Sequence, residues 1–304
     1  MMSLRQLEYL VTIVDEGSFT RAAQLLHVSQ PALSQQVRAL ERTAGGPLLE
    51  RLPRTVRLTP TGRAMLPHAR AALADAARAV SAARETTGTE AGELLLATVF
   101  SVSLGVLPPV LRAWRRRHAE VRIRLLEHRH TDELRDAMTA GQPDIAIGPE
   151  PAGWGGPIHP LGIEEFVVVV APDDPAAGRH RVRLSSLADR DWVHYAPDNG
   201  LAEVLDQVCA GAGFLPRAAV RTEQTAAAPI LAAAGLGPAL VPANVVPPRF
   251  DGCVLRPDPP IRRPLVAYTR TAPDPLTAAF LTVLTGRACV LPSHVRRLPA
   301  FRSG

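Results

Sequence analysis

The chain has 304 residues, 46% of them hydrophobic, and a formal net charge of +5. This length allows two or more domains with a sizeable core. Its three cysteines are scattered and odd in number, which argues against a disulfide framework or a zinc site. A buried, inert thiol is the expected state, and a redox sensor at Cys209 or Cys253 is the alternative. No signal peptide is recognised, and the longest apolar run, 166–171, is too short to span a bilayer, so we expect a cytoplasmic protein that contacts no membrane.

Most of the positive charge lies near the amino-terminal end. Residues 1–70 hold nine Arg against five acidic residues, whereas the rest of the chain holds 25 Arg against 24. All 34 basic residues are Arg, whose planar guanidinium pairs well with phosphate. A local excess of positive charge of this kind is typical of DNA-binding regions.

Three helices are predicted in residues 4–42. A helical apolar stripe in residues 4–14 predicts the first, and two more follow, joined by a tight turn at His27-Val28. The stripe of the second helix consists of Phe19, Ala22, Ala23 and Leu26. Ser29 is expected to cap the third helix, with Pro31 in its first turn, where a missing N–H costs nothing.

The third helix is predicted to read DNA. The residues expected to face inward are Leu33, Val37 and Leu40, and those expected to face outward are Gln30, Ser34, Gln35 and Arg38. The outward set has no carboxylate, and its amide and hydroxyl groups suit the edges of bases in a major groove. This pattern indicates a helix-turn-helix with its second helix as the reader, and a merely solvated helical hairpin is the plain alternative.

Residues 47–58 predict a short two-stranded wing that carries Arg51, Arg54 and Arg57. Guanidinium groups at such a position suit phosphates or a narrow minor groove.

The order of these motifs resembles the amino-terminal signature of LysR-type transcriptional regulators. The matching segments are 4–10, 17–23, 28–34, 40–41 and 57–62, and Leu49 departs from the pattern, since the family usually has Phe there. The resemblance implies an N-terminal all-α winged helix-turn-helix that binds double-stranded DNA. The residues predicted to bind DNA are Arg21, Ser29, Gln30, Pro31, Ser34, Gln35, Arg38, Arg51 and Arg54.

Residues 62–84 predict a long helix rich in Ala, Arg and Leu. Its apolar residues fall at alternating three- and four-residue steps, at Leu66, Ala69, Leu73, Ala76, Val80 and Ala83. This spacing is typical of the seam of a coiled coil, although a helix that faces a core gives a similar pattern. In the family the segment is a linker helix that dimerises the DNA-binding heads, so we expect a homodimer or homotetramer. Residues 86–92 are expected to form a hinge.

From Glu93 onward, strands alternate with helices in a βαβαβ order, and a second such unit begins near Phe166. The fold class is therefore α/β overall, with doubly wound units. This part resembles the two-lobed, periplasmic-binding-protein-like effector domain of LysR-type regulators, and residues 233–242 are a recognisable piece of it. The domains expected are 1–61 for DNA binding, 62–87 for linker and hinge, and 88–304 for effector binding. Lobe I is expected at about 93–162 and 267–291, and lobe II at about 163–266.

An effector is expected at the carboxyl ends of the strands, where ligands of open α/β sheets bind. Ser101 and Ser103 are expected just before a helix whose free N–H groups favour an anion, and the resemblance makes this stretch the usual effector-contacting segment. The predicted effector-binding residues are Ser101, Ser103, His128, Pro149, Asp198 and Thr225. Plainer readings stay open: the hydroxyls and Asp198 merely cap helices, and residues 128–130 are solvated surface.

Two other functions are alternatives for this sequence. A hydrolase would need Ser103, a His and an Asp as a triad, but residues 101–105 lack the first Gly of a nucleophile elbow. An architectural DNA-binding protein would keep the same amino-terminal domain and respond to no effector. The favoured function is a ligand-responsive transcription regulator with no catalytic residue, cofactor or metal, and RNA polymerase is a further candidate partner.

Overall fold

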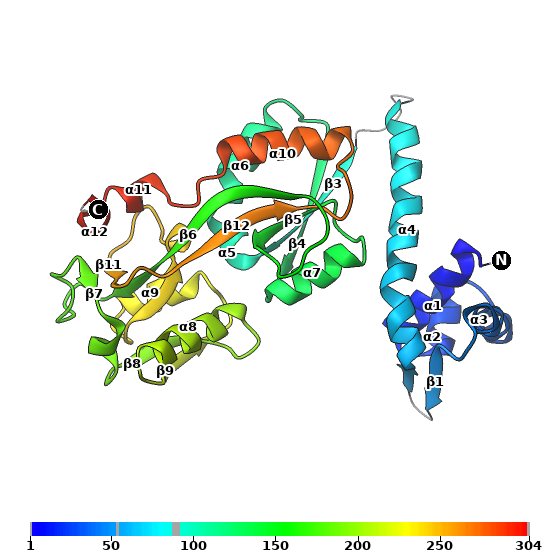
Figure 1. Ribbon diagram of the computed structural model, residues 1–304, viewed down its shortest axis with the longest axis horizontal. Helices are drawn as coiled ribbons and strands as arrows, with labels where there is room; N and C mark the ends of the chain where they lie inside the picture. Colours follow the sequence, from blue (N-terminus) through cyan, green and yellow to red (C-terminus); the bar gives the residue numbers. More distant parts are fainter. Residues whose placement is uncertain (1, 53–54, 87–91, 303–304) are drawn as a thin grey trace. The chain divides into compact units, whose positions relative to one another are not determined.

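The computed structural model describes residues 2–52, 55–86 and 92–302. Residues 1–92 fall in one compact unit and most of residues 93–304 in another. We call the first unit the head and the second the body, and each is described by itself (Figure 1).

The head is built around three helices that enclose one apolar core. They are α1 (Leu4–Glu16), α2 (Phe19–Leu25) and α3 (Gln30–Ala44). The apolar stripes predicted from the sequence supply this core, in which Leu10, Ile13, Leu33 and Leu40 are fully buried. The side chains of Ser3, Ser18 and Ser29 cap the three amino-terminal ends. The turn between α2 and α3 contains His27 with a positive φ of 53°.

Two short antiparallel strands follow as the predicted wing, β1 (Leu49–Leu52) and β2 (Thr55–Leu58). Hydrogen bonds connect the wing to the helical part of the head. The Val56 N–H donates to the Gly17 carbonyl over 3.2 Å, and one carboxylate oxygen of Glu41 accepts from the N–H of Leu48 over 3.0 Å. Leu49, which stands where the family usually has Phe, is buried in the core of the head.

The first half of the long helix α4 (Pro60–Thr86) packs into the core of the head. Ala69 is buried in this core and Leu73 packs against it, and α4 lies against α1. At these two positions the core-facing alternative is therefore observed, and dimerisation through α4 stays a prediction. Val80, by contrast, is 54% exposed, and the side chain of Ala83 lies outside the described residues.

The body contains one long mixed sheet with the strand order β4-β3-β5-β12-β6-β11-β7. The strands of its first lobe are β3 (Glu93–Val99), β4 (Arg122–His128), β5 (Ile145–Pro149) and β12 (Arg262–Tyr268). The helices of that lobe are α5 (Phe100–Gly105), α6 (Leu107–Arg115), α7 (Thr131–Thr139) and α10 (Pro275–Arg287). Because β4 and β5 both pair with β3 in parallel, the predicted βαβαβ order is confirmed.

The second lobe surrounds another apolar core. Its elements are β7 (Arg181–Val182), β8 (Asp191–Tyr195), α8 (Gly200–Gly211), β9 (Arg217–Thr222), α9 (Ala227–Ala233), β10 (Ala239–Pro242) and β11 (Cys253–Pro257), with short 3-10 turns η1 (Leu184–Leu187) and η2 (Ala243–Val245). The last helices, α11 (Ser293–Arg296) and α12 (Pro299–Arg302), also pack here, with Val295 buried in this core.

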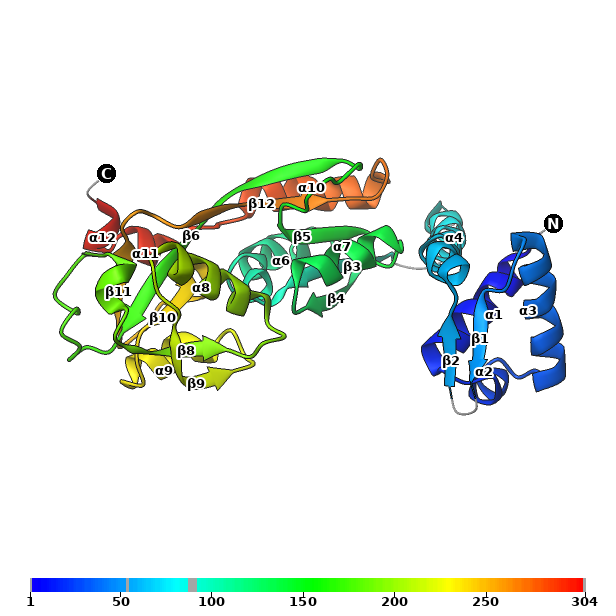
Figure 2. The same ribbon diagram turned by 60° about the horizontal axis from the view of Figure 1, so that its bottom comes forward.

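Two neighbouring strands connect the lobes. The strand β6 (Ile158–Val170) pairs with β12 through its first half and with β10 and β11 through its second half. Figures 1 and 2 show β6 and β12 running side by side from one lobe into the other. None of the helices in the described ranges combines the length and the apolar character that crossing a bilayer needs.

Candidate functional site

The exposed face of α3 matches the sequence interpretation at three positions and departs from it at one. Gln30, Gln35 and Arg38 are exposed, while Leu33, Val37 and Leu40 are buried as expected. Ser34 is only 7% exposed, and its hydroxyl accepts a hydrogen bond from the Gln30 amide over 3.2 Å. The outward orientation predicted for Ser34 is therefore wrong, and its contact holds the side chain of Gln30 on the surface.

The start of α3 and the neighbouring helix hold three more of the predicted residues. The Ser29 hydroxyl accepts from the Ala32 N–H over 3.4 Å, and Pro31 lies exposed in the first turn. Arg21 is exposed on α2 and donates to the backbone carbonyl of Glu16. Sequence reasoning missed Arg42, which follows Arg38 by one helical turn and lines a surface groove with it.

The wing arginines are described only in part. Arg51 lies in β1, but its side chain falls outside the described residues, as does the whole of Arg54. Arg57 is exposed on β2, paired in register with Glu50.

In the body, the carboxyl ends of strands and the starts of helices meet at one small cavity. Its lining comes from the junction of β3 with α5, from the starts of α7 and α8, and from β12 and β5. The residues are Val99, Phe100, Ser101, Arg129, Thr131, Pro149, Asn199, Gly200, Leu201, Thr225 and Arg263. Helix starts carry unpaired N–H groups and partial positive charge, and within the described part of the chain no Asp or Glu lines this cavity. The site therefore favours negative charge.

Ser101 and Thr225 bring hydroxyl groups to this cavity. Ser101 is 3% exposed and lies inside α5, not before a helix as the sequence suggested. Val99 occupies the capping position of α5 and Ala226 that of α9, and neither helix has a side-chain cap. The reading of Ser101 and Ser103 as helix caps is therefore wrong, since both lie inside α5. Within residues 92–302, neither the Ser101 nor the Thr225 hydroxyl has a hydrogen-bond partner.

The rim of the cavity is closed by contacts between the lobes. Arg129 of lobe I forms an ion pair with Asp198 of lobe II, and its carbonyl accepts from the Gly200 N–H over 3.0 Å. Asn199, not Asp198, caps α8, so the capping reading of Asp198 is also wrong. The volume enclosed is about 30 Å³, which is room for one water molecule.

Two predicted residues lie elsewhere. The Ser103 hydroxyl donates to the Phe100 carbonyl over 2.9 Å and also contacts Glu127, and Ser103 is not part of the cavity lining. His128 ends β4 and does not line the cavity. Burial lowers the pKa of His128, against the opposing charge of Glu133, so this ring adds no positive charge at neutral pH. Pro149 does line the cavity, as expected.

Thr131 and Arg263 line the cavity but were missed. Thr131 directly follows the 128–130 segment, so the end of a strand followed by the start of a helix could have indicated it. No local sequence pattern indicated that Arg263 lines the cavity. It lies near the start of β12 and reaches the cavity only through the pairing of β12 with β6.

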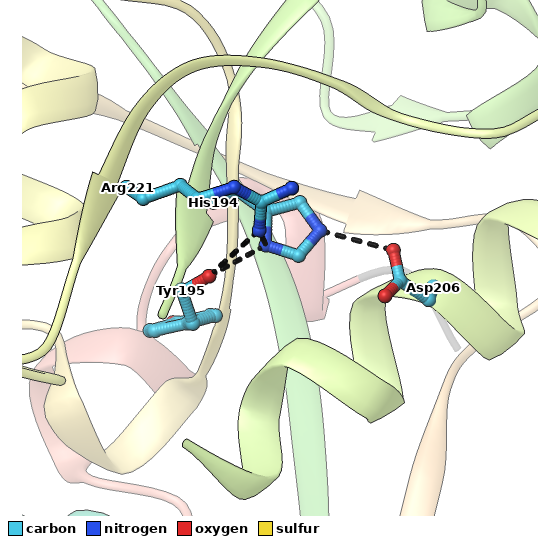
Figure 3. Close-up of polar contacts among 4 residues, drawn as sticks. All are labelled: His194, Tyr195, Asp206 and Arg221. Atoms are coloured by element: carbon cyan, nitrogen blue, oxygen red, sulfur yellow. Dashed lines mark hydrogen bonds and ion pairs between the residues drawn. The ribbon is translucent and has the colours of Figure 1, made fainter. Parts of the chain in front are cut away.

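The body also holds a buried histidine that bears on the hydrolase alternative (Figure 3). His194 is 1% exposed, with Nε2 3.0 Å from Asp206 Oδ1 and Nδ1 3.0 Å from Arg221 Nη1. Nε2 donates to Asp206, whereas Nδ1 lies between the Tyr195 carbonyl oxygen, 2.9 Å away, which can only accept, and the Arg221 guanidinium, which can only donate. Both ring nitrogens are thus engaged by groups other than a hydroxyl or thiol. Ser103 is bonded to Phe100 and Glu127, so the triad considered from the sequence is not formed.

Comparison with known proteins gives the same division of the chain. Residues 4–63 match the family model described as bacterial regulatory helix-turn-helix protein, lysR family, and residues 87–288 match that of the LysR substrate binding domain. The chain is 32% identical to the HTH-type transcriptional regulator ShiR of Corynebacterium glutamicum (strain R), over 79% of this chain and 82% of that one.

Two further similarities extend over most of the chain. It is 34% identical to a probable hydrogen peroxide-inducible genes activator of Mycobacterium avium, over 78% of this chain and 76% of that one. Full-length CbnR, solved in complex with its target DNA, aligns with a TM-score of 0.64 and 27% identity, over 95% of this chain and 100% of that one. The chain therefore belongs to the LysR family of transcriptional regulators, with a helix-turn-helix DNA-binding head and a two-lobed α/β effector-binding body.

Proposed function

We propose that this regulator binds a small anionic effector in the cavity lined by Ser101, Thr225 and Arg263, and that occupancy changes how its heads contact DNA. The observation that supports this most is Ser101, a residue that is 3% exposed and whose hydroxyl caps no helix and has no partner within residues 92–302. Buried polar groups in folded proteins almost always have a hydrogen-bond partner. A hydroxyl without one, beside a cavity, is a candidate for binding a ligand.

An effector larger than one water molecule requires the lobes to separate. The contacts that must break are those of Arg129 with Asp198 and with Gly200, and the paired strands β6 and β12 are the connection about which the lobes would move. A ligand shifts such an equilibrium only by its difference in affinity for the two arrangements. An effector that binds the separated lobes more tightly therefore favours that arrangement.

On the DNA side, we place Gln30, Gln35 and Arg38 against base edges, because they are the exposed residues of the predicted reading helix. Arg21, Ser29 and Pro31 lie beside them, and the wing residues Arg51 and Arg54 would contact phosphate or the minor groove. Ser34 would act by holding Gln30.

Self-association would place two heads on two half-sites, with the exposed second half of α4 as the contact. The likeness to CbnR, solved in complex with its target DNA, supports DNA binding itself. RNA polymerase remains a proposed partner on the ground of family membership alone.

Peroxide sensing is a second candidate, suggested by the name of the relative from Mycobacterium avium. A redox sensor needs an accessible thiolate. Burial, reinforced by the charge of Asp206, raises the pKa of the Cys209 thiol to about 12. Cys209 would therefore react slowly with peroxide, so a peroxide sensor in this chain would have to use Cys253 or Cys289, which are partly exposed.

The test is a cavity variant, Ser101→Ala with Thr225→Ala, studied by calorimetry with a panel of small carboxylic acids. We expect acids that bind the wild-type chain to lose most of their affinity for the variant. Binding to DNA without ligand should be unchanged, because the head is a separate unit. Ser186→Ala, an exposed serine outside the cavity, is the matched control. If the variant binds the same acids with unaltered affinity, the effector lies elsewhere.

A further inference from the structure

Arg263 lies at the point where β12 passes between the lobes. Its Cα partner across the strand pair is Glu164 of β6, and its side chain lines the cavity that also contains Ser101 (β6 and β12 in Figure 1). It is thus an arginine fixed on the connection between the lobes rather than on a loop.

One edge of the Arg263 guanidinium is held by the protein. Its Nε donates to Glu164 Oε2, and the guanidinium lies over the ring of Phe166, 5.0 Å from the ring centroid. Glu164 is 0% exposed, and its other oxygen accepts from the Asn244 amide over 2.9 Å. A charged group oriented in this way loses little freedom when a ligand binds to it.

The other edge is available. Within the described ranges, the two terminal nitrogens of Arg263 have no hydrogen-bond partner, although the side chain is only 21% exposed. Arg129, the other cation of the lining, is paired with Asp198 in this arrangement of the lobes, and the proposed separation of the lobes would release it. In this arrangement, the two terminal nitrogens of Arg263 are therefore guanidinium donors without a partner in the described part of the chain, and they belong to the same cavity as the unpaired hydroxyl of Ser101.

We propose that Arg263 determines the chemical class of the effector by binding a carboxylate through its two terminal nitrogens. This inference rests on the proposed effector cavity. A planar carboxylate accepts two parallel N–H bonds from a guanidinium, and such charge-assisted pairs are roughly twice as strong as neutral hydrogen bonds. The cavity walls also include Phe100, Pro149 and Leu201, so a small organic acid with an apolar body fits better than inorganic phosphate.

The chain offers a matched control in the preceding residue. Arg262 is bonded to Glu165, is 52% exposed and does not line the cavity. Neighbouring residues of a strand point to opposite faces of the sheet. Arg262 therefore places a guanidinium group on the opposite face of β12. Arg263→Lys and Arg262→Lys each keep one positive charge opposite a buried glutamate, and both remove the two-nitrogen edge.

The experiment is calorimetry of the full-length wild type, Arg263→Lys and Arg262→Lys with acetate, lactate and benzoate, with the corresponding amides, and with inorganic phosphate. We expect the wild type to bind at least one acid and not its amide. Arg263→Lys should weaken that binding about tenfold or more, and Arg262→Lys should leave it unchanged. Thermal unfolding checks that each variant is folded. Should Arg263→Lys be unstable, the double variant Arg263→Gln with Glu164→Gln removes the buried pair together and should show the same loss.

The outcomes separate the inference from the function on which it rests. If an acid binds and Ser101→Ala weakens it while Arg263→Lys binds like wild type, the cavity is correct and the role of Arg263 is wrong. Equal binding of acid and amide, or tighter binding of phosphate, contradicts the carboxylate class. If none of the acids binds the wild type at millimolar concentration, the proposed function and this inference both fail.

Discussion

We propose that single side chains of α3 determine how the head reads a DNA sequence. Gln30 and Gln35 are exposed, and Gln30 is positioned by its hydrogen bond to Ser34. Gln36 is also exposed on the same helix, but its amide oxygen accepts from Gln6 of α1 over 3.2 Å. The helix thus presents glutamines with two different surroundings.

We expect Gln30→Ala or Gln35→Ala to cost about 1–3 kcal/mol at the cognate site and to relax preference at one base pair. Gln36→Ala removes the same amide group from the side of α3 that faces α1. It should leave both the binding free energy and the base preference nearly unchanged. Selection of bound sequences from a random library, followed by titration of the best site, measures both effects. An unaltered site preference in both Gln30→Ala and Gln35→Ala would show that α3 does not read bases.

The residues of the cavity could be predicted only where local order in the chain places them. Pro149 is the last residue of a strand, and Ser101 and Thr225 follow strand ends closely, so their place was predicted from the order of the elements. Ser103, two residues beyond Ser101, points elsewhere because α5 begins at once and turns it toward Glu127. Arg263 could not be predicted, because its place depends on the register between strands about 100 residues apart.

At the scale of elements, most helices and strands follow from apolar periodicity, and the exceptions depend on tertiary contacts. The helix α5 was not predicted. It packs against η2 so closely that a Cβ on Gly105 would lie 2.1 Å from the Asn244 carbonyl oxygen. Only the apolar second half of β6 was predicted, because Pro160 and Gly162 interrupt the first half. Pairing with β12 makes that half a strand.

The apolar stripe of α4 has different surroundings in the two halves of the helix. Its first half completes the head, through Ala69 and Leu73, and only the second half leaves apolar residues such as Val80 exposed. The regular spacing could not distinguish these halves, because a core and a partner helix require the same periodicity.

We expect Val80→Asp to weaken self-association of the full chain without lowering the thermal stability of the head. A carboxylate at an apolar interface is costly, whereas at an exposed site of a monomer it is not. Sedimentation velocity measures the assembly, and Ala79→Asp, an exposed position about a quarter-turn around the helix, is the matched control. Leu73→Asp should instead destabilise the head itself. If Val80→Asp sediments like wild type, the second half of α4 is not the interface.

For the whole molecule, the division into a DNA-binding head and a two-lobed body was predicted from the order of motifs, and family membership confirms it. Communication between the two parts was not predictable in the same way. In the mechanism we propose, it depends on the contacts of Arg129 with Asp198 and Gly200, which join the two lobes, and on the strands β6 and β12 that connect them. Coupling requires that an effector bind two arrangements of these lobes with different affinity.

The most direct test of this coupling is a hydroxyl-radical footprint of the full-length chain on its native promoter, with and without a carboxylic acid that binds in calorimetry. We expect the protected region to change its extent or spacing when the acid is added. With Ser101→Ala the same ligand-free footprint should appear and stay constant. If the wild-type footprint is the same without acid and at saturating acid, the coupling of cavity and heads is contradicted. That result would favour an architectural protein whose DNA binding does not respond to an effector.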